Sequence, residues 1–254
     1  YYGSGDKENV RKSVHTFILF MFILSIALSL LGVALTPFLI KIIKAPPEVA
    51  KEEYIYLTIY FSGISGLLLY NMGSAIFRAV GNSQLPFIFL VVSACLNIIM
   101  DLVFVIVLKM GTSGVAMATI ISQAISALLV LGALKITQSQ VSFKFRELKI
   151  NWKILSRIIF IGLPSAIQMA VTAFSNVFVQ SYINQFGADV MGGWTAYNKV
   201  DQIIFLPMQC MGLAAMTFVG QNYGAGNIKR AKRGADISLL SALTSTLILV
   251  VPVI

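Results

Sequence analysis

The chain has 254 residues, of which 57% are hydrophobic and only 11% are charged, and its formal net charge is +9. Soluble globular domains carry about 25% charged residues, so this composition excludes a soluble domain. Several apolar runs of about 18 residues or more instead predict an all-α, polytopic helical membrane protein. The basic residues lie in short loops between these runs, which is typical of membrane topology and argues against nucleic acid as a partner.

Seven apolar segments are expected to span the lipid bilayer. A polar loop at 1–13 precedes them, and Gly81-Asn82 followed by Pro86 predicts a tight turn between two helices. Because the chain has no initiator Met and stops inside an apolar run, we expect it to be a piece of a longer protein. The segments lie at about 14–43, 54–77, 85–108, 115–134, 158–183 and 194–219, with an unfinished one from about 236.

The distribution of lysine and arginine predicts the orientation in the membrane. Of the 19 basic residues, fourteen fall in loops on one side and four on the other, with Lys199 inside a span. By the positive-inside rule, the basic side is cytoplasmic, in a multi-pass protein of the cell (cytoplasmic) membrane. The loop at 135–157 is long and carries Trp152, so we expect a connector on the membrane surface. The cytoplasmic loops are those at 1–13, 78–85, 135–157 and 220–233.

A short repeat occurs in two of these loops. Tyr2-Gly3-Ser4-Gly5 followed by Arg11-Lys12 matches Tyr223-Gly224-Ala225-Gly226 followed by Lys232-Arg233, at an offset of 221 residues. Six predicted spans lie between the copies, and an even number keeps both copies in the same orientation. The pattern indicates two parallel halves in a parent protein of about twelve spans.

One predicted span carries a carboxylate, Asp101. An Asp at the centre of a membrane helix costs about 2.5–3.5 kcal/mol, so such residues usually have a function. Asn97 is four positions earlier and therefore on the same helix face. A carboxylate beside an amide can exchange a proton or hold a small cation such as Na⁺; the alternative is a hydrogen bond that only joins two helices. Thr119 and Tyr56 in neighbouring spans could complete this site, or could be a self-bonded hydroxyl and an interfacial aromatic.

Polar side chains also mark the fifth and sixth predicted spans. In the fifth they recur every four residues and form a stripe, which must face protein or water. We interpret the stripe as the wall of an aqueous substrate cavity, with a helix contact as the alternative. Methionine suits ligands of variable shape but is also common filler in membrane helices. The candidate cavity residues are Gln168, Thr172, Asn176, Gln180, Asn198, Asp201, Gln202 and Met208.

Enzyme and metal motifs do not occur. The sequence contains no P-loop, zinc-protease or hydrolase motif, so it predicts no enzyme, no cofactor and no ATP hydrolysis. Cys95 and Cys210 fall within apolar segments, where we expect packing rather than a disulfide or metal ligation. The single histidine, His15, has no partner motif. Active transport by this protein would therefore use an ion gradient.

Several motifs spread over the whole chain resemble those of the multidrug and toxic compound extrusion (MATE) family. They are Gln221-Asn222-Tyr223-Gly224-Ala225-Gly226-Asn227, its echo Tyr2-Gly3-Ser4-Gly5, Tyr56-Leu57-Thr58-Ile59, Arg78-Ala79-Val80-Gly81-Asn82-Ser83, Asn97 with Asp101, and Gly162-Leu163-Pro164. The resemblance implies a twelve-span antiporter of two six-helix lobes. Residues 1–134 would then be the rest of the N-terminal lobe (spans three to six), 135–157 the cytoplasmic connector, and 158–254 the start of the C-terminal lobe (spans seven to nine).

The resemblance also implies a function and a site. It predicts a monomeric exporter of cationic or lipophilic compounds in exchange for H⁺ or Na⁺, with an ion site at Tyr56, Asn97, Asp101 and Thr119. A span-one Asp of the family's site would precede residue 1. One branch of the family has a Glu near the position of Thr172, so this chain departs from that branch.

Two other functions stay open at this point. A flippase for a lipid-linked oligosaccharide or peptidoglycan precursor would need cationic residues in the cavity, where only Lys199 qualifies. A polytopic membrane enzyme would need a polar catalytic cluster near one membrane face, and the sequence does not reveal one.

Overall fold

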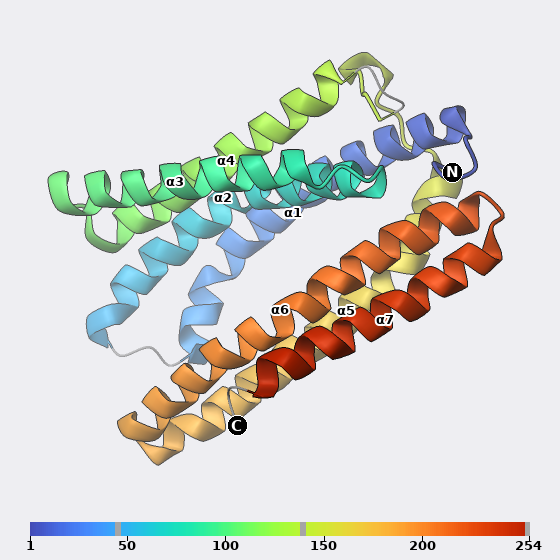
Figure 1. The fold of residues 1–254 in the computed structure, drawn as a ribbon. Helices are drawn as coiled ribbons and strands as arrows, with labels where there is room; N and C mark the ends of the chain where they lie inside the picture. The colour runs from blue at the N-terminus through green and yellow to red at the C-terminus, as the bar shows by residue number, and fades with distance from the viewer. Residues whose placement is uncertain (44–46, 138–140, 252–254) are drawn as a thin grey trace. The chain divides into compact units, whose positions relative to one another are not determined.

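The structure, a computed structural model, describes residues 1–43, 47–137 and 141–251 and is helical almost throughout (Figure 1). The described residues contain no strand, and seven helices are long and apolar enough to cross a membrane. The predicted all-α membrane fold is therefore confirmed. The long helices are α1 Lys7–Ile43, α2 Pro47–Ala79, α3 Gln84–Asp101, α4 Gly111–Ile136, α5 Trp152–Ile183, α6 Ala188–Gly224 and α7 Ile228–Val250. The short ones are the π-helix η1 Leu102–Val107 and the 3₁₀ turns η2 Phe145–Glu147 and η3 Asn184–Phe186.

The helices extend beyond the apolar segments at their polar ends. α1 begins at Lys7, inside the predicted loop 1–13, and α6 and α7 leave only residues 225–227 of the predicted loop 220–233 outside a helix. The prediction of loops in these stretches was wrong. An apolar run marks only the part of a helix that meets lipid, whereas the backbone hydrogen bonds continue into polar sequence.

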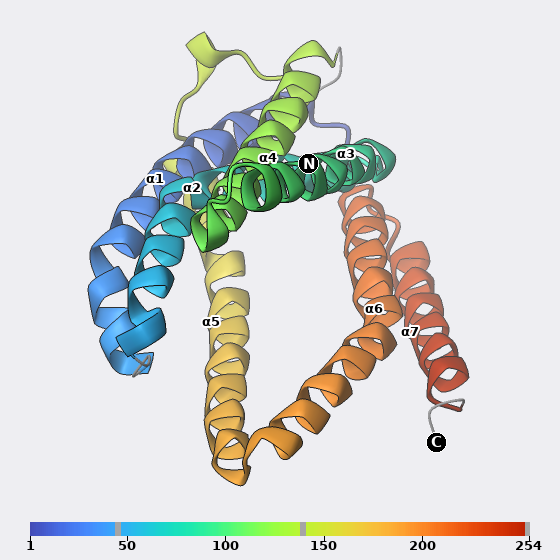
Figure 2. The same ribbon diagram turned by 90° about the vertical axis from the view of Figure 1, so that its left-hand side faces the viewer.

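The chain divides into two compact units, 7–155 and 1–6 together with 156–254. In the first unit, α2 packs against α1 and α4, and α3 packs against α4. In the second, α6 and α7 run along each other, and α5 joins α6 through η3 (Figure 2). The helix pairs that pack together lie within one unit or the other.

Glycines bring α2 and α4 into close contact. A Cβ atom added to Gly66 would lie 2.9 Å from the backbone nitrogen of Ala124, so no larger residue fits without a shift. Small residues at helix contacts in membranes allow this approach of two backbones. The opposed positions differ by 57 or 58 residues, which shows that the two helices run parallel: Gly63 lies against Ile120, Gly66 against Ala124, and Gly73 against Val130.

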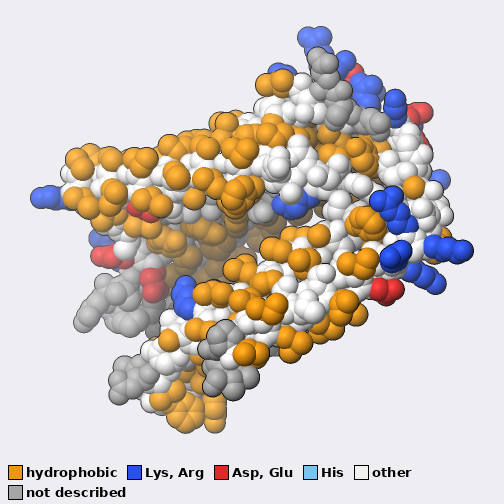
Figure 3. Space-filling model, viewed as in Figure 1, with side chains coloured by type: hydrophobic (Ala, Val, Ile, Leu, Met, Phe, Trp, Pro, Cys, Tyr) orange, Lys and Arg blue, Asp and Glu red, His pale blue; other side chains and the backbone are white. Residues whose placement is uncertain are grey.

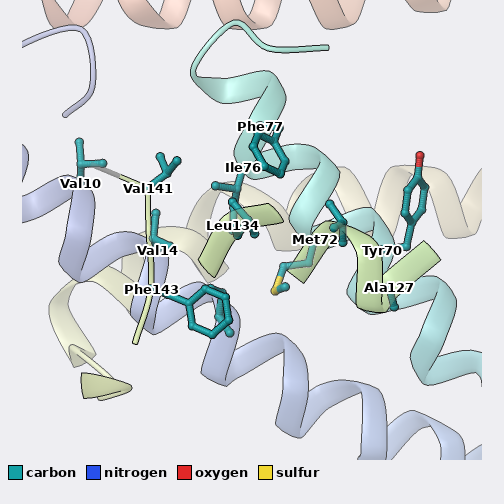
Figure 4. Packing of buried hydrophobic residues seen from close by; sticks show 12 residues of the cluster. Val10, Val14, Tyr70, Met72, Ile76, Phe77, Ala127, Leu134, Val141 and Phe143 are labelled. Carbon is teal, nitrogen blue, oxygen red and sulfur yellow. The ribbon is translucent and has the colours of Figure 1, made fainter. Parts of the chain in front are cut away.

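The connector between α4 and α5 packs against the start of α1. Val141 and Phe143 are only 2% and 1% exposed, and they belong to a hydrophobic cluster with Val10 and Val14 of α1 (Figure 4). This part of the connector therefore belongs to the hydrophobic core of the first unit and does not lie free on the membrane surface. Residues 138–140 of the predicted connector lie outside the described residues.

Hydrogen bonds and an ion pair also hold the connector against the start of α1. The ring Nδ1–H of buried His15 donates to the Arg11 carbonyl (2.8 Å), and its Nε2 accepts from the Lys144 amide (3.3 Å). The fully buried Thr16 hydroxyl accepts from the Asn151 amide at 3.1 Å. Arg11 also forms an ion pair with Glu147. His15, which has no metal-binding partner in the sequence, links two segments of backbone here.

The surface of the second unit is largely apolar. In Figure 3, hydrophobic side chains cover α6 and α7 along most of the visible face, and basic side chains gather around their connecting turn. Phe160 and Phe178 of α5 are 80% and 73% exposed, as expected for helices in contact with lipid or with other helices of a membrane protein. Cys95 and Cys210 are free thiols on exposed positions.

Candidate functional site

Asp101 is the last residue of α3, and its oxygen Oδ1 is buried. Within the described residues this atom has no hydrogen-bond partner, and neither has the buried amide nitrogen Nδ2 of Asn97. Buried polar atoms in native proteins almost always have partners, so an unsatisfied carboxylate oxygen calls for an ion, a water or a proton. Both side chains are half-buried, as a site that must exchange its ligand requires.

The contacts between α3 and α4 show which residues of α4 lie at the same height along the helix axes as Asn97 and Asp101. The Ser93 hydroxyl donates to the Ser122 carbonyl at 2.7 Å, and the two helices are antiparallel neighbours. Further along the pair, Phe104 packs against Gly114 of α4, so Asp101, three residues before Phe104, lies within about one turn of the level of Gly114. Asn97 and Asp101 follow Ser93 at intervals of four residues and thus lie along the same side of α3.

Thr119 lies one turn from the level of Asp101. At about 100° per residue, it is about 60° round α4 from Ser122, which meets α3, and about 100° from Ile120, which meets α2. It is thus on the side of α4 between these two neighbours. Its hydroxyl donates to the Val115 carbonyl at 2.9 Å, which leaves the oxygen free to accept or to coordinate.

Tyr56 lies on the side of α2 that turns toward α3. It precedes Tyr70 by fourteen residues, close to four full helix turns, and the Tyr70 hydroxyl donates to the Pro86 carbonyl of α3 at 2.9 Å. The Tyr56 ring stacks on Tyr60 with a 6.2 Å centroid separation. By the parallel register of α2 and α4, Tyr56 lies near the level of Gly114 and hence of Asp101.

Sequence reasoning did not find Gln123. Its Oε1 atom is buried without a hydrogen-bond partner in the described structure. Gln123 follows Thr119 by four residues, so it continues the same face of α4 one turn further along. The same spacing separates Asn97 from Asp101, but the sequence alone does not show which neighbours this face of α4 meets. We call Tyr56, Asp101, Asn97, Thr119 and Gln123 the polar ladder.

The hydroxyl of Thr58 is also buried without a hydrogen-bond partner in the described structure, but it is not part of the ladder. Thr58 precedes Phe61 and Ser62 by three and four residues, and the carbonyls of these two accept from the Ser29 hydroxyl of α1. Thr58 therefore lies on the α1 side of α2, away from the α3 side.

The ladder offers a defined set of ligands. It holds one carboxylate, with amide and hydroxyl groups around it, and the described residues contain no group of three His, Cys, Asp or Glu side chains that could hold a metal. Hard neutral oxygens with one carboxylate suit H⁺ or Na⁺ better than a transition metal. The ion site at Tyr56, Asn97, Asp101 and Thr119 stays a prediction, and the chemistry of these groups is compatible with it.

The candidate cavity residues are all in the second unit. Gln168, Thr172 and Asn176 are exposed on α5, and the Thr172 hydroxyl donates to the Gln168 carbonyl at 3.1 Å. Gln180, Asn198 and Asp201 are half-buried, and Gln202 and Met208 are exposed. Most described residues of α5 and α6 are exposed, apolar ones included, so this exposure does not single out a cavity wall, and the substrate cavity stays a prediction.

Comparison with known proteins identifies the class of the molecule. A family model described as MatE matches residues 1–103 and 164–254. The chain is 32% identical over 228 residues to the probable multidrug resistance protein YpnP of Bacillus subtilis (strain 168), a match that covers 90% of this chain and 51% of that protein. A crystal structure of MATE in the bent conformation superposes with a TM-score of 0.88 at 23% identity, over 98% of this chain and 56% of that one. Fold and relatives together define a multi-pass helical membrane protein of the class that this family model describes.

The chain belongs to the MatE family, as its motifs predict. It is also 23% identical over 258 residues to the FAD transporter of Shewanella oneidensis, covering 98% of this chain and 56% of that protein. The chain thus spans about half the length of the curated relatives it matches.

Proposed function

We propose that this chain is part of a secondary active antiporter that exports cationic or lipophilic drugs in exchange for H⁺ or Na⁺. The observation that carries the proposal is the buried, unpartnered carboxylate oxygen of Asp101 inside a membrane-spanning helix, with the polar ladder beside it. Relatives described as multidrug resistance proteins support the direction of transport and the substrate class.

Asp101 is the proposed coupling residue. It takes up H⁺, or holds Na⁺ together with Asn97, when the cavity faces outside, and releases the ion when the cavity faces the cytoplasm. Thr119 and Gln123 supply neutral oxygens, and the Tyr56 hydroxyl supplies a hydrogen bond. Exchange follows because the ion binds the two states of the protein with different affinity.

The second unit carries the proposed substrate cavity. Amide and hydroxyl groups on α5 and α6 form hydrogen bonds to polar parts of a substrate, and Asp201 attracts a cation. Met208 adapts to apolar parts of different shape. The stripe on α5 comprises Gln168, Thr172, Asn176 and Gln180, and the row on α6 comprises Asn198, Asp201, Gln202 and Met208.

The proposed organisation follows the sequence. Residues 1–134 belong to an N-terminal lobe and 158–254 to a C-terminal lobe, joined by the connector 135–157. The polar segments at 1–13, 78–85, 135–157 and 220–233, which include helix ends, face the cytoplasm of a cell whose plasma membrane holds the protein as a monomer.

Efflux of a fluorescent organic cation from proteoliposomes tests the proposal. The full-length protein that contains this chain should transport under an imposed pH or Na⁺ gradient, and Asp101→Asn should lower the coupled rate at least a hundredfold while the protein stays monodisperse. Gln123→Leu should weaken coupling about tenfold or more, because an apolar side chain cannot replace its oxygen.

Thr58→Val is the matched control, since Thr58 also has a buried unpartnered hydroxyl but on the α1 side of α2. This variant should transport at the normal rate. Normal gradient-driven efflux by Asp101→Asn would refute the proposed coupling role. Efflux of FAD but not of cations would keep the coupling site and change the substrate class.

A further inference from the structure

The docked connector sorts its side chains between two sides. Val141 and Phe143 point into the hydrophobic cluster of the first unit and are 2% and 1% exposed. Of residues 144–153, every exposed one is basic or aromatic. We call these six exposed residues the outer surface of the connector: Lys144, Phe145, Arg146, Lys149, Trp152 and Lys153.

This surface carries an excess of positive charge. Residues 135–155 contain five basic residues and one acidic residue, Glu147, so their formal net charge is +4. Glu147 forms ion pairs with Arg11 and, at 3.6 Å, with Lys144. Among the described residues, the remaining basic side chains of this stretch form no ion pair; they are Lys135, Arg146, Lys149 and Lys153. The unbalanced charge favours an anionic partner.

Hydrogen bonds to α1 order the backbone beneath these side chains. The Lys144 amide donates to Nε2 of His15 at 3.3 Å, and the Lys149 carbonyl accepts from the Thr16 hydroxyl at 3.4 Å. Arg146 lies between these two points of attachment. A surface that is already ordered loses less conformational entropy when it binds a partner.

The surface lies at one end of the helices of the first unit. α1 begins here, and α2 and α4 end here, because Val10, Phe77 and Leu134 of these helices meet in one hydrophobic cluster with the connector. In Figure 3, basic side chains gather over the connector, at the upper right. All three helices are long and apolar enough to cross a membrane, and the ends of such helices lie among lipid headgroups.

Exposed aromatic rings accompany the basic side chains. Phe145 and Trp152 are 65% and 76% exposed. Nζ of Lys135 lies 5.8 Å from the centroid of the Phe145 ring, so the end of α4 and the connector contribute to the same surface. Aromatic and basic residues occur together where a protein meets the membrane interface. The partner that fits this surface has both an anionic group and an apolar part.

We propose that the outer surface of the connector, together with Lys135, binds anionic phospholipid. The basic side chains contact the headgroup phosphates, and Phe145 and Trp152 lie against the start of the acyl chains. Each Lys or Arg near an anionic membrane surface raises the affinity about fivefold. A lipid that bridges Lys135 of α4 and Arg146 of the connector binds the docked form better than the undocked one, and so stabilises docking. This binding does not require the proposed antiport.

Quenching of Trp152 fluorescence by brominated lipid tests this surface locally. The full-length protein, with Trp152 as its only tryptophan, is placed in phosphatidylcholine nanodiscs that contain increasing amounts of brominated phosphatidylglycerol or brominated phosphatidylcholine. Phosphatidylglycerol should be preferred at Trp152 by about tenfold or more. Arg146→Gln with Lys149→Gln removes two unpaired charges and should lower this preference by about tenfold or more.

Lys41→Gln with Lys109→Gln is the matched control. Lys41 lies in the last turn of α1 and Lys109 precedes the start of α4, so both lie at the other end of these helices. The control pair removes the same two charges, also from exposed positions. It should leave the lipid preference at Trp152 unchanged.

Three results would overturn the lipid site. They are equal quenching of Trp152 by the two lipids, an equal loss of preference in the two double variants, and displacement of phosphatidylglycerol by inorganic phosphate beyond that by chloride of the same ionic strength. Equal loss in both variants would show only the general attraction of a basic protein to an anionic membrane. If the preference depends on Arg146 and Lys149 while no ion gradient drives efflux, the antiport proposal fails and the lipid site stands.

Discussion

The docked connector gives the sharpest test of the first unit's packing. Phe143 is 1% exposed within the hydrophobic cluster, whereas Phe145, two residues later, is 65% exposed. Replacing a buried Phe by Ala costs about 3–5 kcal/mol, because apolar contact is lost and a cavity remains. Every 1.4 kcal/mol changes an equilibrium about tenfold, so Phe143→Ala should raise the undocked population of the connector by about a hundredfold to several thousandfold.

Hydrogen exchange of the connector measures this population. The amides of Lys144 and Asn151 donate to His15 and Thr16 only while the connector is docked. Their exchange, followed by mass spectrometry of the protein in nanodiscs, should accelerate about a hundredfold or more in Phe143→Ala.

The same experiment on Phe145→Ala provides the control. Phe145 contacts Phe143 edge-on at 5.1 Å between centroids but is otherwise exposed, so its removal should change exchange less than tenfold. Equal acceleration in both variants would show that the cluster around Phe143 does not hold the connector, and the docking argument would be refuted.

Two further predictions concern other contacts. Gly66→Ala should lower the thermal unfolding temperature in detergent, because its Cβ would press on the Ala124 backbone, while Gly132→Ala should leave it unchanged; equal effects would contradict the close approach of α2 and α4. Burial acts to raise the pKa of Glu147, but the hydrogen bond and charge of Arg11, with smaller effects of Lys144 and His15, lower that pKa below its usual 4.5. A lowered pKa of Glu147 stabilises the docked connector above about pH 4.5, and this contribution is lost as the pH falls through the lowered pKa. Acid itself slows amide exchange, so the quantity to compare is the exchange rate divided by that of the unfolded chain at the same pH. This ratio should rise in acid in the wild type and not in Glu147→Gln.

Much of the fold was predictable because lipid imposes a simple rule. Each segment such as 115–134 had to be long, apolar and helical, and the structure contains all seven expected helices. The π-helix after Asp101 was not predictable. The amide of Leu108 donates to the carbonyl of Val103, five residues earlier. Local packing selects this hydrogen bond, and the hydrophobic periodicity of the sequence does not reveal it.

The candidate site was predictable where spacing within one helix defines it. Asn97 and Asp101 are four apart, and an intramembrane carboxylate is conspicuous in any sequence. Gln123 was missed because its importance depends on the register of α4 against two neighbours, and Thr58 could be assigned to the other side of α2 only from the contact of Ser29 with α1. Helix register is a property of tertiary packing that one sequence without its structure does not contain.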